Sequence, residues 1–201
     1  MTKKYSDAQN AQTDALRKDG DRIFTMLIAL TGAARSGKDT AGQFFCSTYG
    51  FTQYAFADPI RAGLRAALGL TDWHFNEGKE IVIPEYGKSP RQLMQLFGTE
   101  FGRNLIHPDI WQIRAANAVR TVPDLVITDC RFDNEATWVR ENGGYVVHIA
   151  RDNAPQVSAH ISENGISENL IHFKINNNGT LDAFFDGLRF IYEVGLGAKP
   201  V

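Results

Sequence analysis

The feature of this sequence that most constrains its fold is a glycine-containing loop between an apolar run and a helix-forming segment. The apolar run is MLIAL, residues 26–30, and the loop is GAARSGKDT, residues 32–40. A short, continuous apolar run is typical of a strand buried on both faces of a parallel sheet. The loop fits G-x-x-x-x-G-K, the pattern of a phosphate-binding loop that leads from such a strand into a helix.

The residue types in this phosphate-binding loop suit a polyphosphate ligand. Glycines allow positive φ and a close approach of the backbone to the ligand. The N–H groups of the loop and of the helix N-terminus present positive potential to an anion. Lys38 is predicted to reach the β- and γ-phosphates as a mobile charge, whereas the alternative is a turn with an exposed lysine. The residues predicted to bind the nucleotide are Gly32, Ala34, Arg35, Ser36, Gly37, Lys38, Asp39 and Thr40.

The position after the loop lysine departs from the usual pattern. Asp39 stands where Ser or Thr is common, and Thr40 follows it. The hydroxyl of Thr40, one position later, can still face Mg²⁺, so Thr40 is the predicted metal ligand. Asp39 is predicted either to interact with the helix dipole or to act as an outer group around the metal.

The rest of the chain alternates strand-like and helix-like segments. Strands are expected within residues 51–57, 124–129, 145–150 and 172–175, whereas residues 69–90 have no clear periodicity. This alternation predicts a three-layer α/β fold with a mostly parallel sheet. Ligands of such sheets bind beyond the carboxyl ends of the strands.

Three charged residues follow predicted strands at that edge. Asp129 closes the strand at 124–129, and is interpreted as a second Mg²⁺-associated carboxylate or as a cap of the next turn. Arg131 is predicted to project toward a phosphate from the same edge. Arg151 begins a polar segment with the composition of a flap, where an arginine either clamps the transferred phosphate or is simply solvated.

Composition limits the partners of the chain. It has 23 acidic and 21 basic residues, a formal charge of −2, which gives no general attraction to nucleic acid or to an anionic membrane. No apolar run approaches the ~18 to 20 residues of a membrane span. Two cysteines and a polar start without an apolar signal segment favour a reduced, cytoplasmic setting. Residues 1–25 are interpreted as a polar N-terminal extension.

Several longer segments of the sequence resemble one known family. They are RSGKDT (35–40), FADPIR (56–61), RQLMQLFGTEFGRNL (91–105), ITDCRFDNEA (127–136), GGYVVHIARD (143–152), HISENGI (160–166) and NNGTLDAFF (177–185). In this order they resemble the deoxynucleoside monophosphate kinases of tailed bacteriophages, which are relatives of adenylate kinase. The G-K-x-T ending of the loop is also similar to that of adenylate kinase.

The resemblance implies an enzyme that uses ATP and Mg²⁺ to phosphorylate a deoxynucleoside monophosphate. It implies one kinase domain over residues 26–195, with a helical acceptor-binding insertion at about 58–121 and a lid at about 151–170. It also implies contacts of Arg131 and Arg151 with the donor and the transferred phosphate. For a phage-encoded chain, the setting is the host cytoplasm, and the helical faces leave room for a homodimer. The residues implied to contact the acceptor are Asp58, Arg61, Arg91, Gln95, Thr99 and Arg103.

Two other functions remain open on the residues alone. Arg91, Gln95 and Thr99 recur at helical spacing, and periodicity by itself favours an ordinary solvated face for them. A P-loop kinase of another phosphorylated small molecule, such as dephospho-coenzyme A or phosphomevalonate, would share the donor site. A non-catalytic ATP-binding module would also share the loop.

Overall fold

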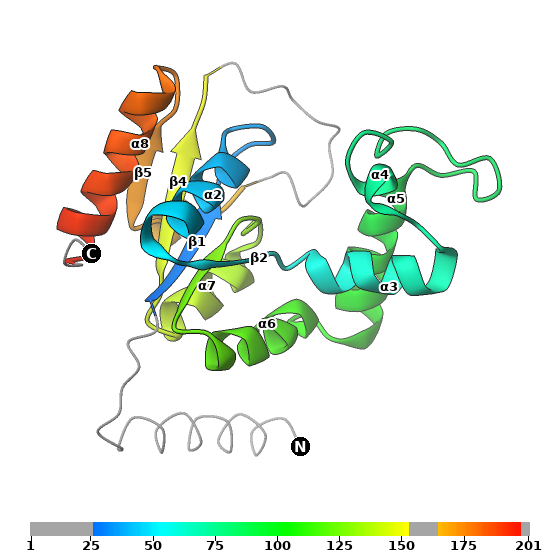
Figure 1. Cartoon of the computed structure of the whole chain (residues 1–201). Helices are drawn as coiled ribbons and strands as arrows, with labels where there is room; N and C mark the ends of the chain where they lie inside the picture. The colour runs from blue at the N-terminus through cyan, green and yellow to red at the C-terminus, as the bar shows by residue number, and fades with distance from the viewer. Residues whose placement is uncertain (1–25, 153–164, 198–201) are drawn as a thin grey trace, which may run out of the picture.

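The computed structural model describes residues 26–152 and 165–197, and these residues form an α/β fold around a five-stranded parallel sheet (Figure 1). The strands have the order β2-β3-β1-β4-β5, and every neighbouring pair is parallel. This confirms the predicted fold class. The strands are β1 (Met26–Thr31), β2 (Thr52–Tyr54), β3 (Asp124–Ile127), β4 (Tyr145–Ala150) and β5 (Phe173–Asn176).

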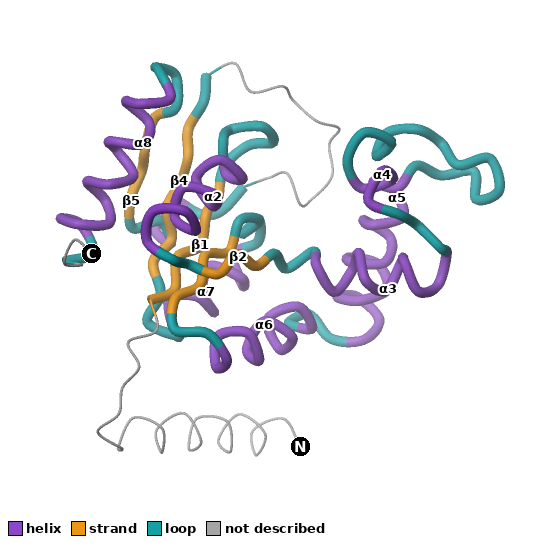
Figure 2. Tube along the Cα trace, viewed as in Figure 1, coloured by secondary structure: helices purple, strands orange, loops and turns teal. Residues whose placement is uncertain are grey.

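Helices cover both faces of the sheet. One cluster of core residues joins the sheet to α2 and α8, and a second joins its other face to α6 and α7. The arrangement has three layers, as predicted (Figure 2). The helices are α2 (Lys38–Tyr49), α3 (Asp58–Leu68), α4 (Asp72–Phe75), α5 (Pro90–Gln95), the π-helix η1 (Leu96–Ile106), α6 (Ile110–Thr121), α7 (Asp133–Glu141), the 3₁₀ turn η3 (Glu168–Leu170), α8 (Leu181–Phe190) and the π-helical η4 (Ile191–Gly195).

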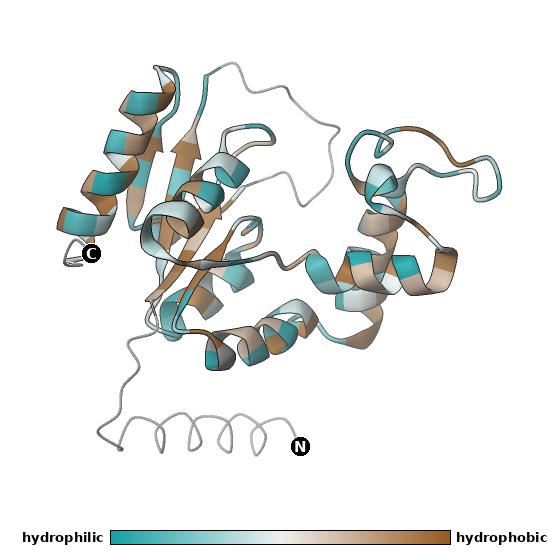
Figure 3. Cartoon of the chain, in the orientation of Figure 1, coloured by the Kyte–Doolittle hydropathy of each residue, from teal (hydrophilic) through white to brown (hydrophobic). Residues whose placement is uncertain are grey.

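The central strand shows why a continuous apolar run predicts a buried parallel strand. Alternate side chains of a strand point to opposite faces of the sheet. Accordingly, Leu27 and Ala29 join the core on the α6 and α7 side, whereas Ile28 and Leu30 join the core on the α2 and α8 side. Both faces need apolar residues, and the colours of Figure 3 show the hydrophobic strands between helices with polar outer faces.

Helices α3, α4 and α5 stand apart from the sheet, on the side of the short strand β2 (Figure 1). Glycines let α3 pack closely on η1, because a Cβ on Gly98 would lie 2.7 Å from Cδ1 of Ile60 and one on Gly63 would lie 2.9 Å from Cζ of Phe97. The aperiodic segment 69–90 is mostly irregular, as expected, but contains the short helix α4.

The spacing of Leu93, Leu96, Phe97 and Phe101 after Ser89, a candidate N-cap, predicts one regular amphipathic helix, and the structure differs from it. Ser89 caps α5 as expected, since its Oγ accepts a hydrogen bond from the Gln92 N–H. The chain then changes to the π-helix η1, whose i→i+5 bonds rotate later residues away from a 3.6-residue stripe. Leu96, at the change of helix type, is 40% exposed, and Phe101 within η1 is 47% exposed.

Two smaller differences concern the elements beside β3. Strand β2 is shorter than the 51–57 segment expected for it. The pair Asp58-Pro59 predicts an N-cap at Asp58, but Asp58 is the first residue of α3, and its carboxylate accepts the Ala55 N–H at 2.9 Å. Within the described ranges, the structure contains no helix with the length and apolar character to cross a membrane. Residues 1–25, predicted as an extension, lie outside the described ranges.

Candidate active site

The phosphate-binding loop joins β1 to α2 at the carboxyl edge of the sheet, where the sequence predicts it. Its backbone has positive φ at Gly32 (137°), Arg35 (62°) and Gly37 (111°). A Cβ on Gly32 would lie 2.3 Å from the carbonyl oxygen of Ile149 in β4, which is closer than real Cβ contacts. The close fit to β4 and the positive φ angle both require glycine at this position.

A residue that sequence reasoning did not single out as a site residue holds the other end of the loop. The side-chain amide of Asn177, which follows β5, donates to the Ser36 carbonyl at 2.8 Å. It lies so close to Gly37 that a Cβ there would be 2.4 Å from Nδ2 of Asn177. Ser36 Oγ is buried and has no hydrogen-bond partner among the described residues. A polar cradle with an unsatisfied hydroxyl suits an anionic ligand with oxygen acceptors.

Lys38 lies inside this loop. It is 9% exposed, and its Nζ donates to the carbonyls of Gly32 at 2.8 Å and Ala33 at 2.7 Å. An ammonium group on a flexible stem can exchange such carbonyl partners for phosphate oxygens. The lysine is therefore placed for the predicted role toward phosphate.

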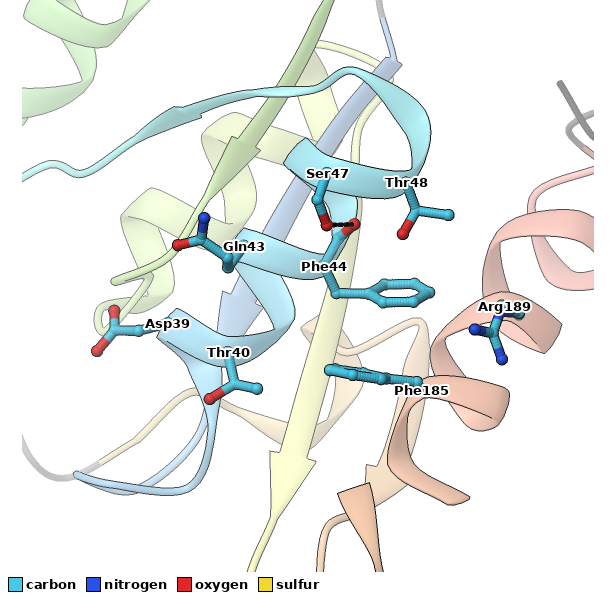
Figure 4. Close-up of a pocket in the computed structure, with 8 residues that line it drawn as sticks. All are labelled: Asp39, Thr40, Gln43, Phe44, Ser47, Thr48, Phe185 and Arg189. Atoms are coloured by element: carbon cyan, nitrogen blue, oxygen red, sulfur yellow. Dashed lines mark hydrogen bonds between the residues drawn. The ribbon is translucent and has the colours of Figure 1, made fainter. Parts of the chain in front are cut away.

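Asp39 and Thr40 occupy the first turn of α2, and both are exposed. They stand at one end of a groove of about 540 Å³ between α2 and α8, in which the rings of Phe44 and Phe185 stack with centroids 4.8 Å apart (Figure 4). The groove is lined by Asp39, Thr40, Gln43, Phe44, Ser47, Thr48, Phe185 and Arg189.

The described residues contain no cluster of three or more His, Cys, Asp or Glu side chains that could hold a metal. Mg²⁺ does not require one, because it is commonly bound by one or two protein oxygens together with substrate phosphates. The Thr40 hydroxyl and the Asp39 carboxylate, at the end of the phosphate-binding loop, are oxygen donors of that kind. The residues present thus fit a magnesium–nucleotide complex.

Asp129 follows β3 and is bound to the backbone of the neighbouring turn. Its Oδ1 accepts the Phe56 N–H at 2.7 Å and its Oδ2 accepts the Ala57 N–H at 3.0 Å. Burial raises the pKa of the carboxyl, while Arg131 and these two N–H groups act in the opposite direction. The carboxylate therefore fixes the turn before α3 instead of capping the next turn along the chain. Each oxygen still has a second lone pair for a metal-bound water.

The two predicted phosphate arginines lie at different strand ends. Arg131 is half-buried just beyond β3. Arg151 is exposed just beyond β4, with its Nη1 3.4 Å from the Arg35 carbonyl of the phosphate-binding loop. The structure thus brings Arg151 to the loop, and Arg131 to the same edge of the sheet. Residues 153–164 of the predicted lid lie outside the described ranges.

The predicted acceptor residues lie on α3, α5 and η1. Arg61 pairs with Asp58, with Nη1 and Oδ1 2.9 Å apart, and Arg91 pairs with Glu80, with Nε and Oε1 2.6 Å apart. The four predicted residues on α5 and η1 are each half-buried, so they are neither fully solvated nor part of the core. They are Arg91, Gln95, Thr99 and Arg103.

The last of these four residues leads to a residue that sequence reasoning missed. Nη2 of Arg103 donates to Oε1 of Glu135 at 2.5 Å, across from η1 to α7. Glu135 is 2% exposed, and its Oε2 accepts the N–H groups of Arg131 at 2.7 Å and Phe132 at 3.1 Å. The available signal was a glutamate at the third position of a helix that begins at Asp133, the spacing of a capping carboxylate.

The titration of Glu135 gives a test of this geometry. Burial raises its pKa from 4.5 to about 7, although Arg103 acts in the opposite direction. Because the folded chain holds this proton more tightly than the unfolded chain, the stabilisation is complete below pH 4.5 and is lost as the pH rises through about 7. We expect the wild type to lose on the order of 2 kcal/mol relative to Glu135→Gln over that window in urea unfolding. If the free energies of unfolding of the two proteins changed with pH in the same way, the result would contradict the burial of an ionisable carboxyl at residue 135.

Comparison with known proteins identifies relatives over most of the chain. The family model described as "Deoxynucleotide monophosphate kinase" matches residues 26–83 and 70–188. A protein of Acanthamoeba polyphaga mimivirus, assigned to the deoxynucleotide monophosphate kinases, is 29% identical over 178 residues, or 80% of this chain and 92% of its own length. The deoxynucleotide monophosphate kinase of Enterobacteria phage T4 is 24% identical over 84% of this chain and 99% of its own.

The deoxynucleoside-5'-monophosphate kinase of Escherichia phage T5 is 35% identical over 56% of this chain and 46% of its own length. Among solved structures, the shikimate kinase of Acinetobacter baumannii aligns with a TM-score of 0.47 at 14% identity, covering 89% of this chain and 96% of that one. The dephospho-CoA kinase of Campylobacter jejuni aligns with a TM-score of 0.44 at 14% identity, covering 84% and 96%.

Proposed function

The chain belongs to the deoxynucleotide monophosphate kinase family, and from this premise we propose that it moves the γ-phosphoryl group of ATP onto the 5′-phosphate of a deoxynucleoside monophosphate. The observation that carries the proposal is the phosphate-binding loop, which is closed by β4 and Asn177 and holds Lys38 inside it. The strand-end residues Asp129 and Arg131 lie along the same edge of the sheet. The products are a deoxynucleoside diphosphate and ADP.

The reaction makes modest chemical demands on the protein. An oxygen of the acceptor phosphate forms the new P–O bond, and the bond between the γ-phosphorus and the β,γ-bridging oxygen breaks, leaving its electron pair on ADP. The attacking oxygen is already anionic near neutral pH, so no strong general base is needed. Catalysis then consists of in-line positioning and neutralisation of the charge that spreads over the phosphoryl oxygens.

The donor side is assigned to the phosphate-binding loop. Its N–H groups and the N-terminus of α2 bind the phosphates of ATP, and Lys38 contributes a charge toward the β- and γ-phosphates. Thr40 and Asp129 would hold Mg²⁺, with Asp39 as an outer group, and the ion would supply further neutralisation of phosphate charge. Arg151, which already contacts the loop at the Arg35 carbonyl, is assigned to bind the transferred phosphoryl group.

The acceptor side is assigned to α3, α5 and η1. Arg61 and Arg91 are each paired with a carboxylate that competes with phosphate for the same guanidinium, Asp58 and Glu80 respectively. Both carboxylates are at least half-exposed, so their ion pairs are weak and can be replaced by a bidentate phosphate. Gln95 and Thr99, which are half-buried on the same continuous helical stretch as Arg91, are assigned hydrogen bonds to the acceptor.

A coupled assay of ADP formation tests the proposal. The purified protein, ATP and Mg²⁺ are incubated with each common deoxynucleoside monophosphate, and with ribonucleotides, dephospho-coenzyme A and phosphomevalonate as comparison acceptors. We expect turnover with at least one deoxynucleoside monophosphate and formation of its diphosphate. Turnover only with a comparison acceptor would favour another P-loop kinase, and ATP binding without transfer would favour a non-catalytic module.

Asp129 has two assignable roles, holding Mg²⁺ and fixing the start of α3. The Asp129→Asn variant tests them through two different measurements. Asp129→Asn keeps one oxygen for the Phe56 N–H and removes the negative charge near the metal, but it also turns an NH₂ group toward the Ala57 N–H. We expect the Mg²⁺ concentration for half-maximal activity to rise by about 10-fold. An unchanged Mg²⁺ dependence with a raised KM for the acceptor would restrict Asp129 to fixing the start of α3.

A further inference from the structure

We propose that Glu135 is a positioning residue that locks the acceptor-binding helices onto the segment carrying Arg131. The contact between Glu135 and Arg103 is called the Glu135–Arg103 latch. The inference rests on the proposed function, because it gives Glu135 the role of keeping the bound acceptor and Arg131 in the correct positions relative to each other.

The latch is built into the interior of the molecule. The side chains of Arg103 and Glu135 are 10% and 3% exposed, in contrast to the largely exposed ion pairs elsewhere in the described chain. The Arg103 guanidinium also lies over the ring of Phe132, 4.3 Å from its centroid, and donates to the Pro108 carbonyl at 3.0 Å. Removing one member of such a buried pair leaves the other charge without compensation, so its loss has larger effects than loss of a surface pair.

On the core side, the latch reaches the catalytic segment directly. One oxygen of Glu135 receives the backbone N–H groups of Arg131 and Phe132, and thereby fixes the turn between β3 and α7. The other oxygen receives Arg103. A single carboxylate therefore determines both where the Arg131 backbone lies and how far η1 stands from it.

On the other side, the latch reaches the acceptor helices through close packing. Trp111 of α6 packs on Gly102, beside Arg103, and its indole N–H donates to the Gly98 carbonyl at 2.8 Å. Gly98 in turn contacts Ile60 of α3, the neighbour of Arg61. Because α5 continues into η1 without a break, Arg91 belongs to the same continuous helical stretch. A displacement of η1 would therefore move both acceptor arginines.

The donor site is held by different groups. Gly32 fits against β4, and Ser36 is bound by Asn177 beyond β5, at the opposite end of the sheet order from β2. No contact of the latch among the described residues involves this loop. The inference thus predicts a selective effect on the acceptor and on the transfer step, with the affinity for ATP preserved.

Two substitutions cut the latch from opposite sides. Glu135→Gln retains one oxygen for the N–H groups of Arg131 and Phe132, but turns an NH₂ group toward the Arg103 guanidinium, so two donors face each other. Arg103→Met removes the guanidinium and leaves the Glu135 cap of α7 in place, which keeps a test available if the first variant does not fold. Glu141→Gln, at an exposed glutamate on the same helix, is the matched control.

The experiment measures kcat and KM for both substrates, together with ATP affinity by calorimetry, in the wild type, both single variants, the double variant and the control. We expect each single variant to lower kcat/KM for the deoxynucleoside monophosphate by about 10-fold or more, with the ATP dissociation constant changed by less than about twofold. The double variant should be no worse than the more affected single variant, because both remove one interaction.

Three results would overturn the latch. They are single variants with kcat/KM near the wild-type value, an ATP affinity that falls as much as the acceptor parameters, and single effects that multiply in the double variant. The last result would mean that Arg103 contacts the acceptor itself. A wild type without phosphotransfer would overturn the proposed function and the latch together, whereas an active wild type with unaffected variants would overturn the latch alone.

Discussion

Replacing Lys38 with alanine is expected to lower kcat by about 10²-fold or more, since removal of one preorganised charge contact has effects of this size. Lys38 Nζ lies within the phosphate-binding loop over the carbonyls of Gly32 and Ala33, and it is the one ammonium group that the described structure places there. The measurement is steady-state ADP formation at saturating ATP and deoxynucleoside monophosphate.

The control for this prediction is Lys174→Ala, which removes a lysine from the edge strand β5 whose ion pair with Glu168 is exposed. This control should retain nearly full activity, because exposed ion pairs contribute little. Circular dichroism establishes that both variants are folded. Near-normal turnover of folded Lys38→Ala would remove the lysine from the proposed mechanism.

Replacing Gly32 with alanine is expected to abolish ATP binding and to reduce the free energy of unfolding by about 3 kcal/mol. The new Cβ would be 2.3 Å from the Ile149 carbonyl oxygen and 2.9 Å from Ser36 Oγ, at a φ of 137°. The Ile149 carbonyl, near the carboxyl end of β4, cannot move away without disturbing the pairing of the sheet, so the loop must shift. Calorimetric titration with ATP and denaturant unfolding measure the two effects.

Gly50→Ala is the control for Gly32→Ala, because it adds the strain of a positive φ without disturbing the phosphate-binding loop. Gly50 ends α2 with a φ of 75° and has nothing within 4 Å of the position of a Cβ. Its replacement should therefore cost about 1 kcal/mol of stability and leave ATP affinity unchanged. If Gly32→Ala bound ATP as well as Gly50→Ala does, the close fit of the loop against β4 would not be needed for binding.

The fold was largely predictable because the strands of this sheet carry strong local signals. β1 is a continuous apolar run because both of its faces are covered, and Gly50 ends α2 in a left-handed conformation that favours glycine. The change from α5 to η1 was not predictable from periodicity. It depends on tertiary contacts, in which Gly98 and Gly102 let Ile60 and Trp111 approach the helix backbone.

The candidate site was predictable where one local segment forms it. The phosphate-binding loop and the strand-end Asp129 follow from short patterns next to apolar runs. Asn177 and Glu135 were not found, because their roles depend on residues far away in the chain. Asn177 binds Ser36 across 141 residues of sequence, and Glu135 binds Arg103 across 32. Such pairs carry no periodicity that a single sequence can show.

The most direct test of the central claim is a single-turnover experiment with ATP labelled at the γ-phosphate. Excess protein is mixed with labelled ATP, Mg²⁺ and the common deoxynucleoside monophosphates, the reaction is quenched, and the products are separated. If the loop at residues 32–40 presents the triphosphate to an acceptor phosphate, the label will appear in a deoxynucleoside diphosphate. Label that stays in ATP, or that is released only as inorganic phosphate, would contradict the account.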